Sequence, residues 1–326
     1  MNISKIAILD YKNRPFIEEH HIKGIKEVVP AVEVVYALSA NELLHKAPDA
    51  DILVTYPYVE GVIDYCKNAK NLKLIHSVIS GVDILVNSEI RDMDIRITST
   101  KGIHGFPMAD HVLAYIYSFL RALPVFGQSQ RNKEWNEAAQ ALCDETFGKT
   151  VGIIGLGKIG EYIAKKCKLL DFRVIALKRT PVQNQWIDKC YSTSETEQFM
   201  KEADFVVAII PLTSETKNMI GEKEFGMMKK SAYFINIARG GIVDEVALVN
   251  ALKAKEIAGA GLDVFVNEPL QKDSPLWDMP NVILTPHAAA QSPFYNDRAF
   301  KVLIENLQRY IRGEELLFES ERSRSW

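Results

Sequence analysis

The sequence predicts an α/β protein with two parallel-sheet domains. Short β-branched runs alternate with helical patterns in two separate series, and a long apolar helix pattern lies between the series. Such alternation is typical of parallel sheets that carry helices on both faces. The chain has 326 residues, of which 47% are hydrophobic, and this is enough to bury a core in each of two domains.

The first series runs from Lys5 to Ser99. We expect its strands at residues 6–9, 32–36, 52–54, 74–76 and 95–98, where apolar and β-branched residues gather. A long apolar helix follows at 106–123, with Pro107 in its first turn, where a missing N–H group costs little. Residues 128–147 are polar and only weakly periodic. We interpret the long helix as a bridge to the second domain.

The second series predicts six strands, at residues 151–154, 174–177, 205–210, 233–237, 259–264 and 282–284. Six alternating strands suit a doubly wound, Rossmann-like sheet, and the first domain reads as Rossmann-like or flavodoxin-like. Residues 293–312 form a closing helix pattern that we expect to pack on the first domain. The predicted domains are therefore 1–100 plus 291–326 and 101–290, with a cleft between them.

Charge and cysteine content narrow the function classes. The 39 basic and 42 acidic side chains give a net charge of -3, so we expect no nucleic-acid or membrane partner. The four cysteines are far apart and form no CxxC pair, which argues against a disulfide framework and a zinc site. The apolar N-terminus is too short for a signal peptide. We predict a cytoplasmic protein whose partner is a small molecule.

A glycine-rich loop follows the first strand of the second series. Gly155-Leu156-Gly157-Lys158-Ile159-Gly160 has GxGxxG spacing and enters a helix pattern. The first glycine permits a tight turn, the second admits a pyrophosphate, and the third lets helix and strand approach. With a strand before it and a helix after it, this loop predicts dinucleotide binding, and a chance glycine loop is the alternative.

The next strand ends in Lys178-Arg179-Thr180. NAD-preferring folds usually place an acid here for the ribose 2′-OH. Two cations and a hydroxyl suit a 2′-phosphate instead, through charge-assisted hydrogen bonds. We therefore predict that NADP(H) is preferred and that NAD(H) is possible. The alternative is an ordinary solvated basic pair on a loop.

Further motifs follow in a fixed order. They are Ala203-Asp204-Phe205, Pro211-Leu212-Thr213, Asn236-Ile237-Ala238-Arg239-Gly240-Gly241, Gly261-Leu262-Asp263-Val264-Phe265, Glu268-Pro269 and Thr285-Pro286-His287. Together they resemble the D-isomer-specific 2-hydroxyacid dehydrogenase family over nearly the whole chain. The resemblance implies a homodimer that moves a hydride between a nicotinamide and the carbonyl carbon of a small 2-oxo acid.

The resemblance implies that Arg239, Glu268 and His287 are the catalytic residues. Negative charge develops on the carbonyl oxygen as hydride arrives, so the site needs a fixed cation and a proton donor. Arg239 suits the first task, because a guanidinium can fork across carboxylate and carbonyl oxygens. His287 suits the second, and Glu268 would orient it and favour its protonated form. Taken singly, each residue also has an ordinary structural interpretation.

Other positions carry over from the family. Pro211, Thr216 and Ala238 resemble cofactor-lining residues, and Asp263 resembles the residue that binds the nicotinamide carboxamide. Asp263 could instead cap the turn at the end of its strand.

In the first domain, the loop that begins Ile79-Ser80-Gly81 resembles the one whose backbone N–H groups hold the substrate carboxylate. A plain turn is the alternative there. Tyr56 ends another strand, and we expect it to shape the pocket.

These features predict an NADP-preferring 2-oxo-acid reductase acting on a small substrate such as glyoxylate or hydroxypyruvate. No metal is expected. Transcriptional corepressors resemble the same family and retain the catalytic residues, so a dinucleotide-sensing binding protein is the alternative function. Fold alone does not decide between the two.

Overall fold

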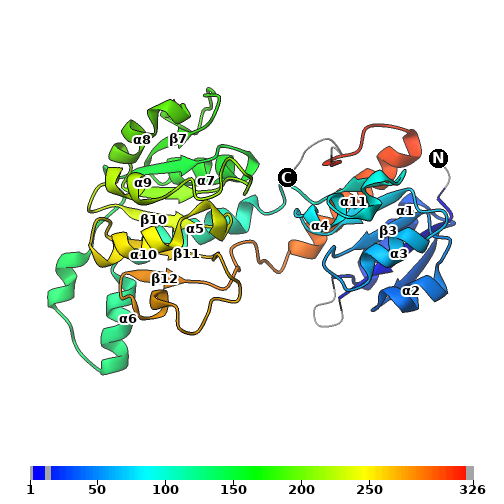
Figure 1. Ribbon diagram of the computed structural model, residues 1–326, viewed down its shortest axis with the longest axis horizontal. Helices are drawn as coiled ribbons and strands as arrows, with labels where there is room; N and C mark the ends of the chain where they lie inside the picture. The colour runs from blue at the N-terminus through cyan, green and yellow to red at the C-terminus, as the bar shows by residue number, and fades with distance from the viewer. Residues whose placement is uncertain (1–2, 12–15, 321–326) are drawn as a thin grey trace. The chain divides into compact units, whose positions relative to one another are not determined.

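The computed structural model describes residues 3–11 and 16–320, which form two compact units (Figure 1). Unit 1 comprises the described residues up to Ile103 together with those from Ser292 onward, and unit 2 comprises His104–Gln291. Each unit is built on a parallel sheet with helices on both faces, so the predicted fold class of two parallel-sheet α/β domains is confirmed.

Unit 1 contains a five-stranded sheet in the order β2-β1-β3-β4-β5, and every neighbouring pair is parallel. This is the flavodoxin-like strand order. All five strands were predicted, to within two residues at each end. The strands are β1 (Lys5–Leu9), β2 (Glu33–Ala37), β3 (Ile52–Thr55), β4 (Leu74–Ser77) and β5 (Arg96–Thr98).

Helices cover both faces of this sheet. On one face, α1 and α11 pack together, and α11 contributes Phe300, Leu303 and Leu307 to the core beneath it. On the other face, α2 and α3 bury Leu43 and Tyr65. The helical elements of unit 1 are α1 (Glu19–Val28), α2 (Ala40–Lys46), α3 (Val62–Asn68), α4 (Asp83–Val86), the 3-10 turn η1 (Glu89–Asp92) and α11 (Tyr295–Arg312).

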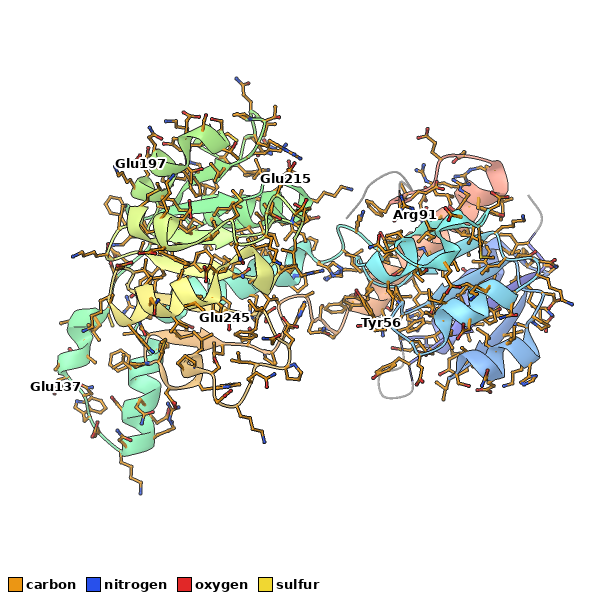
Figure 2. The ribbon with its side chains drawn as sticks, in the orientation of Figure 1. Tyr56, Arg91, Glu137, Glu197, Glu215 and Glu245 are labelled. Atoms are coloured by element: carbon orange, nitrogen blue, oxygen red, sulfur yellow. The ribbon has the colours of Figure 1, made fainter. Side chains whose placement is uncertain are left out.

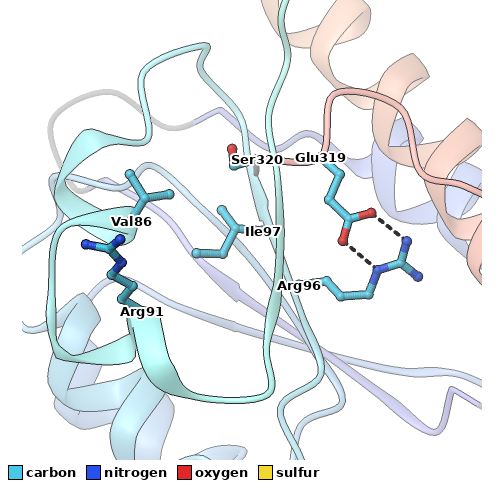
Figure 3. A pocket seen from close by; sticks show the side chains of 6 residues that line it. All are labelled: Val86, Arg91, Arg96, Ile97, Glu319 and Ser320. Carbon is cyan, nitrogen blue, oxygen red and sulfur yellow. Dashed lines mark hydrogen bonds and ion pairs between the residues drawn. The ribbon is translucent and has the colours of Figure 1, made fainter. Parts of the chain in front are cut away.

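The segment after α11 runs beside β5 at the edge of the sheet (Figure 3). The N–H group of Ser320 donates to the carbonyl of Ile97 at 2.8 Å, and Arg96 donates two hydrogen bonds to the Glu319 carboxylate at 2.8 and 2.6 Å. The cavity beside these residues measures about 20 Å³. This is space for about one water, so the cavity is not a substrate site.

Unit 2 contains a seven-stranded parallel sheet in the order β12-β11-β10-β9-β6-β7-β8. The predicted number of six strands is wrong, because β8 was missed. That strand has only three residues at the edge of the sheet, and among them only Tyr191 is buried. The strands are β6 (Thr150–Ile154), β7 (Arg173–Leu177), β8 (Lys189–Tyr191), β9 (Phe205–Ala208), β10 (Tyr233–Asn236), β11 (Gly259–Leu262) and β12 (Val282–Leu284).

Two groups of helices sandwich this sheet. The helices α5 and α7 pack together on one face, and α8, α9 and α10 cover the other. The helix predicted at 106–123 ends at Leu120, because Ala122 has a φ of 51°. The helices are α5 (Gly105–Leu120), α6 (Leu123–Asn132), α7 (Lys158–Leu169), α8 (Thr196–Glu202), α9 (Glu222–Met227) and α10 (Glu245–Lys253). The 3-10 turns are η2 (Ala138–Leu142), η3 (Thr193–Glu195), η4 (Gly240–Ile242) and η5 (Pro275–Asp278).

The strand order of unit 2 reverses between β6 and β9. In open α/β sheets, ligands bind at such a switch point, beyond the carboxyl ends of the strands. The loops that follow β6 to β12 are therefore the places to look for a site. Among the helices of the described residues, none has the length and apolar character needed to cross a bilayer.

Candidate active site

The glycine loop follows β6 at the switch point. Gly155 has a φ of +102°, and a Cβ there would lie 2.6 Å from the carbonyl oxygen of Ile209 on the neighbouring strand end. A Cβ on Gly160 would lie 2.3 Å from the carbonyl oxygen of Gly155. Only glycine fits at these two positions, because Gly155 packs against the residues that follow β9 and Gly160 packs against the carbonyl of Gly155.

The same loop leaves room for an anion. A Cβ on Gly157 would meet nothing within 4 Å, and Gly157 is the N-cap of α7. Lys158 and Ile159 form the first turn of that helix, and the buried Leu156 anchors the loop in the core. Free backbone N–H groups at a helix N-terminus attract phosphate. The loop therefore fits the pyrophosphate of a dinucleotide.

The predicted 2′-phosphate residues lie directly after β7. The N–H group of Lys178 donates to the carbonyl of Tyr191 on β8 at 3.0 Å, while Arg179 and Thr180 are exposed. Arg179 forms an ion pair with Glu215 at 3.0 Å, and their side chains are 82% and 74% exposed. Figure 2 labels Glu215 on the same unit. Arg179 is thus already paired with a carboxylate, and its contact with a 2′-phosphate stays a prediction.

The loop after β9 holds its shape through its own side chains. The hydroxyl of Thr216 donates to the carbonyl of Pro211 at 2.7 Å and accepts the N–H of Thr213 at 2.8 Å. After β10, Ala238 is buried and donates its N–H to the side chain of Asn236 at 3.1 Å. Contact of Pro211, Thr216 and Ala238 with a cofactor stays a prediction.

Glu268 and His287 come together at the ends of β11 and β12. The Nδ1 atom of His287 lies 2.7 Å from Oε2 of Glu268, and the side chains are 48% and 37% exposed. The second carboxylate oxygen, Oε1, accepts the N–H of Phe265 at 3.0 Å. Glu268 is therefore fixed by its own loop and presents one oxygen to the imidazole. The contact with Glu268 uses Nδ1, so a contact between His287 and a substrate would have to be made through Nε2, and such a contact stays a prediction.

Arg239 follows β10, the next strand of the sheet. The buried Asn236 holds its backbone, because the Asn236 side chain donates to the Arg239 carbonyl at 3.1 Å. The Nη1 atom of Arg239 donates to the carbonyl of Ala238 at 2.7 Å. Gly240 packs so closely on the loop after β11 that a Cβ would lie 1.9 Å from the carbonyl carbon of Phe265. The loops that carry the three predicted catalytic residues thus leave adjacent strands, and two of them touch.

Asp263 is buried, and its carboxylate holds the turn that carries His287. Oδ1 accepts the N–H of Ala288 at 2.7 Å and Oδ2 accepts that of Ala289 at 2.9 Å. The N–H of His287 itself donates to the backbone carbonyl of Asp263 at 2.8 Å. The turn held in this way follows β12, whereas the alternative from the sequence was a cap on the turn after Asp263's own strand, β11. Contact with a nicotinamide carboxamide stays a prediction.

The predicted substrate loop follows β4 in unit 1. The Ser77 hydroxyl accepts the N–H of Ile79 at 3.2 Å and donates to its carbonyl at 2.8 Å. The N–H of Thr100, after β5, also donates to that carbonyl at 3.3 Å. Ile79, Ser80 and Gly81 are partly exposed. The loop is thus tied to the ends of β4 and β5, and its contact with a substrate carboxylate stays a prediction.

Tyr56 follows β3, beside the point where the strand order of unit 1 reverses. Its ring lies 6.1 Å from that of Tyr11, which follows β1, and 5.6 Å from that of Tyr58. Figure 2 labels Tyr56. Tyr11 was not selected in the sequence analysis, since nothing in the sequence around it indicates a site. Only the pairing of β1 with β3 brings it beside Tyr56.

Other supporting residues also escaped the sequence prediction. Asn236 and Thr285 are polar residues inside recognised motifs, and His111 on α5 lies 3.0 Å from the Thr285 hydroxyl. The sequence signal that could have found Asn236 and Thr285 is a polar residue at the end of an apolar strand within a motif.

A groove of about 320 Å³ lies between the start of α8 and α9 in unit 2. None of the predicted site residues lines it.

The comparison with family models decides the class of this site. Residues 113–289 match the model described as D-isomer specific 2-hydroxyacid dehydrogenase, NAD binding domain. The chain belongs to the D-isomer specific 2-hydroxyacid dehydrogenase family. Members of this family are NAD(P)-dependent oxidoreductases that act on the CH–OH group of 2-hydroxyacids, and the comparisons support this enzyme class over the corepressor-like alternative.

Three relatives illustrate the family. The glyoxylate reductase of Pyrococcus furiosus is 34% identical over 280 residues, which cover 84% of this chain and 83% of that protein. The D-3-phosphoglycerate dehydrogenase of Methanocaldococcus jannaschii is 32% identical over 302 residues, which cover 91% of this chain but only 56% of that longer protein. The NADPH-dependent glyoxylate/hydroxypyruvate reductase from Sinorhizobium meliloti, solved with NADP and sulfate, has a TM-score of 0.81 at 26% identity and covers 98% of both chains.

Proposed function

We propose that this dehydrogenase is an NADPH-preferring reductase of small 2-oxo acids such as glyoxylate or hydroxypyruvate, and that it accepts NADH less well. The observation that carries the proposal is the 2.7 Å contact between Glu268 and His287 beyond two adjacent strand ends. In this proposal unit 2 binds the dinucleotide and unit 1 binds the substrate.

His287 is the proposed acid and base. Because Nδ1 faces Glu268, a protonated imidazole donates one N–H to the carboxylate and keeps the Nε2 proton for the substrate oxygen. A bound nicotinamide would supply the hydride to the carbonyl carbon. Once the proton has left Nε2, the remaining Nδ1–H still donates to Glu268, so the ring keeps its orientation. In the oxidative direction Nε2 takes the proton from the hydroxyl.

Arg239 is the proposed carboxylate clamp. One guanidinium nitrogen is tied to the carbonyl of Ala238, which holds the planar group in place while its other N–H groups stay available. A fixed guanidinium can bind the carboxylate and the carbonyl oxygen of a 2-oxo acid together. This both orients the substrate and stabilises the charge that develops on the carbonyl oxygen.

Lys178, Arg179 and Thr180 form the proposed 2′-phosphate subsite. They directly follow the strand next to the glycine loop, which is where the adenosine ribose lies in this fold. The relative solved with NADP is described as NADPH-dependent. On the substrate side, we assign the carboxylate to the backbone of Ile79, Ser80 and Gly81, and one wall of the pocket to Tyr56.

We also propose a homodimer. The segment from Lys133 to Gly148 projects from the body of unit 2 after α6 (Figure 1), and it exposes Trp135, Leu142 and Phe147, which are 88%, 57% and 82% accessible. Apolar side chains gathered on one segment favour a protein interface.

The four cysteines are free thiols, which favours the proposed cytoplasmic location.

Initial rates test the function. Oxidation of NADPH and NADH is followed optically with glyoxylate, hydroxypyruvate, pyruvate and branched 2-oxo acids, with His287→Ala as the inactive control. We expect NADPH-dependent turnover of the small acids that is lost in the variant. Tight NADPH binding without turnover of any of these acids would contradict the proposal and favour a sensor.

A further inference from the structure

The side chain of Thr285 links α5 to the turn that carries His287. Its hydroxyl oxygen lies 3.0 Å from Nε2 of His111 and 2.5 Å from the hydroxyl of Tyr115, both on α5. The same oxygen lies 2.5 Å from Oδ1 of the buried Asp263. Three polar groups from two other elements therefore meet on one hydroxyl.

Counting donors fixes the direction of each bond. A threonine hydroxyl has one proton to give and two lone pairs to receive. The Asp263 carboxylate accepts only, so the Thr285 proton points to Asp263. Tyr115 and His111 must then both donate to Thr285, and His111 carries its proton on Nε2. Burial raises the pKa of Tyr115, which keeps its hydroxyl protonated.

The far end of this network is the backbone around His287. Asp263 accepts the N–H groups of Ala288 and Ala289, while His287 has a φ of +52°. A non-glycine residue in this left-handed region is strained by about 1 kcal/mol or more, and it persists only where its surroundings hold it. The carboxylate that holds this turn is itself held by Thr285.

The two α5 residues are placed for this task. His111 and Tyr115 are four residues apart and so lie on the same helix face, and their rings meet edge to face at 4.8 Å. Tyr115 reaches Thr285 across β11 because Gly261 has no side chain. A Cβ on Gly261 would lie 2.7 Å from the ring of Tyr115. A side chain at position 261 would therefore displace the Tyr115 ring from β11.

We propose that His111 and Tyr115 are positioning residues for His287, acting through Thr285 and Asp263 from the face of α5. The proposal rests on the proposed acid and base role of His287. In this proposal neither His111 nor Tyr115 touches the substrate. Their part is to fix the left-handed turn, so that Nδ1 of His287 meets Glu268 and Nε2 meets the substrate.

Four variants test the proposal. His111→Leu and Tyr115→Phe each remove one donor to Thr285, whereas the amide N–H of His111→Gln can replace the Nε2–H of the imidazole. Tyr117→Phe is the matched control, because it removes a hydroxyl from the same helix two residues away, on another face. All four are compared with the unchanged protein by kcat, KM and the pH profile of 2-oxo-acid reduction.

We expect His111→Leu and Tyr115→Phe to lower kcat about tenfold or more, since small misplacements of a catalytic group cost this much. KM for the cofactor should stay within about twofold, and the alkaline limb of the rate profile should move to lower pH, because a displaced His287 loses the support of Glu268. His111→Gln should recover most of the rate. Loss of folded protein alone would scale the rate equally at every pH.

The proposal is overturned if both donor-removing variants keep the rate and pH profile of the unchanged protein, or if His111→Gln is as slow as His111→Leu. Two measurements do not depend on turnover. Nitrogen NMR of the His111 ring should show the proton on Nε2, and the amides of Ala288 and Ala289 should exchange faster in Tyr115→Phe. An inactive parent protein would contradict the proposed function, while these two measurements would still decide the network.

Discussion

Glu268 uses its two carboxylate oxygens for different partners, one for the backbone N–H of Phe265 and the other for Nδ1 of His287. The first contact fixes the carboxylate on its own loop, and the second fixes the imidazole on the next loop. A charge held in this way costs no reorganisation when the imidazole gains or loses its proton. In the proposed mechanism the pair therefore separates two tasks, support on the Glu268 side and proton transfer at Nε2.

Glu268→Gln tests this division. The amide oxygen can still accept the N–H of Phe265, so the loop should keep its shape, but the negative charge beside His287 is lost. We expect kcat for 2-oxo-acid reduction to fall about 100-fold, within the range for acid–base catalysis. The rate should also decline at a lower pH than in the unchanged enzyme.

The control for this variant is Glu197→Gln, which removes a carboxylate that pairs with Lys201 on the surface. Its pH–rate profile should match that of the unchanged enzyme. A full rate and an unshifted profile in Glu268→Gln would show that the carboxylate does not support the proton donor.

Cofactor choice can be tested at the end of β7. Arg179→Ala should raise KM for NADPH about tenfold and leave KM for NADH unchanged, because only NADPH carries the phosphate that the guanidinium would bind. Glu215→Gln should lower KM for NADPH, since it removes the carboxylate that now pairs with Arg179. Steady-state kinetics with both cofactors measures the two effects.

Arg173→Ala provides the matched control, since Arg173 lies at the opposite end of the same strand and pairs with Glu202. It should change neither KM. If Arg179→Ala leaves the preference between the two cofactors as it was, Lys178 and Arg179 are an ordinary solvated pair.

The proposed dimer predicts a second set of variants. Trp135→Ser and Phe147→Ser each remove a large apolar surface that a partner would cover, and burial of one such side chain contributes about 1.5–3 kcal/mol. The double variant should therefore dissociate at micromolar concentration, which sedimentation velocity would show. Trp277→Ser, an exposed tryptophan outside this segment, should sediment like the parent. A monomeric parent protein would contradict the dimer itself.

Most strands were predictable because each central strand is a run of apolar residues in the sequence, and the same run is buried in the structure. Successive residues such as Ile153 and Ile154 point to opposite faces of the sheet and both are buried, so the strand reads as a continuous apolar run with little ambiguity. The edge strand β8 was not predictable, because Lys189 faces solvent and three residues are too few to show a period. The bend at Ala122 is a backbone feature that the apolar pattern does not encode.

The sequence predicted which candidate site residues lie at strand ends, but it did not predict which residues of other elements contact them. Motif order placed Glu268 and His287 after neighbouring strands, and parallel pairing then brings them together. The links from Thr285 to His111 and Tyr115 span more than 160 residues, and helix periodicity cannot reveal which strand end a helix face will meet. Long-range polar contacts therefore had to come from the structure.

The last prediction concerns acid stability. His76 on β4 is completely buried, and its Nδ1 lies 2.9 Å from the hydroxyl of Thr98. Burial lowers the pKa of His76 to about 3, and the backbone of Ala299 offsets only part of this. In the unfolded chain the imidazole titrates near its usual pKa of about 6.5. Between these two pH values the imidazole of His76 is protonated in the unfolded chain but not in the folded protein. The free energy of unfolding therefore falls as pH falls.

His76→Asn removes the titrating group and keeps a polar atom near Thr98. The free energy of unfolding of the unchanged protein should therefore decline more steeply than that of the variant below about pH 6.5, by about 1.4 kcal/mol per pH unit. Urea unfolding at a series of pH values measures the difference, with the exposed His45→Asn as control. The curves of the unchanged protein and His76→Asn should converge as pH falls toward 4. Parallel curves would mean that His76 is protonated in the folded protein as well as in the unfolded chain. We do not expect this, because the imidazole is fully buried and the Thr98 hydroxyl beside it carries no charge that would stabilise the proton.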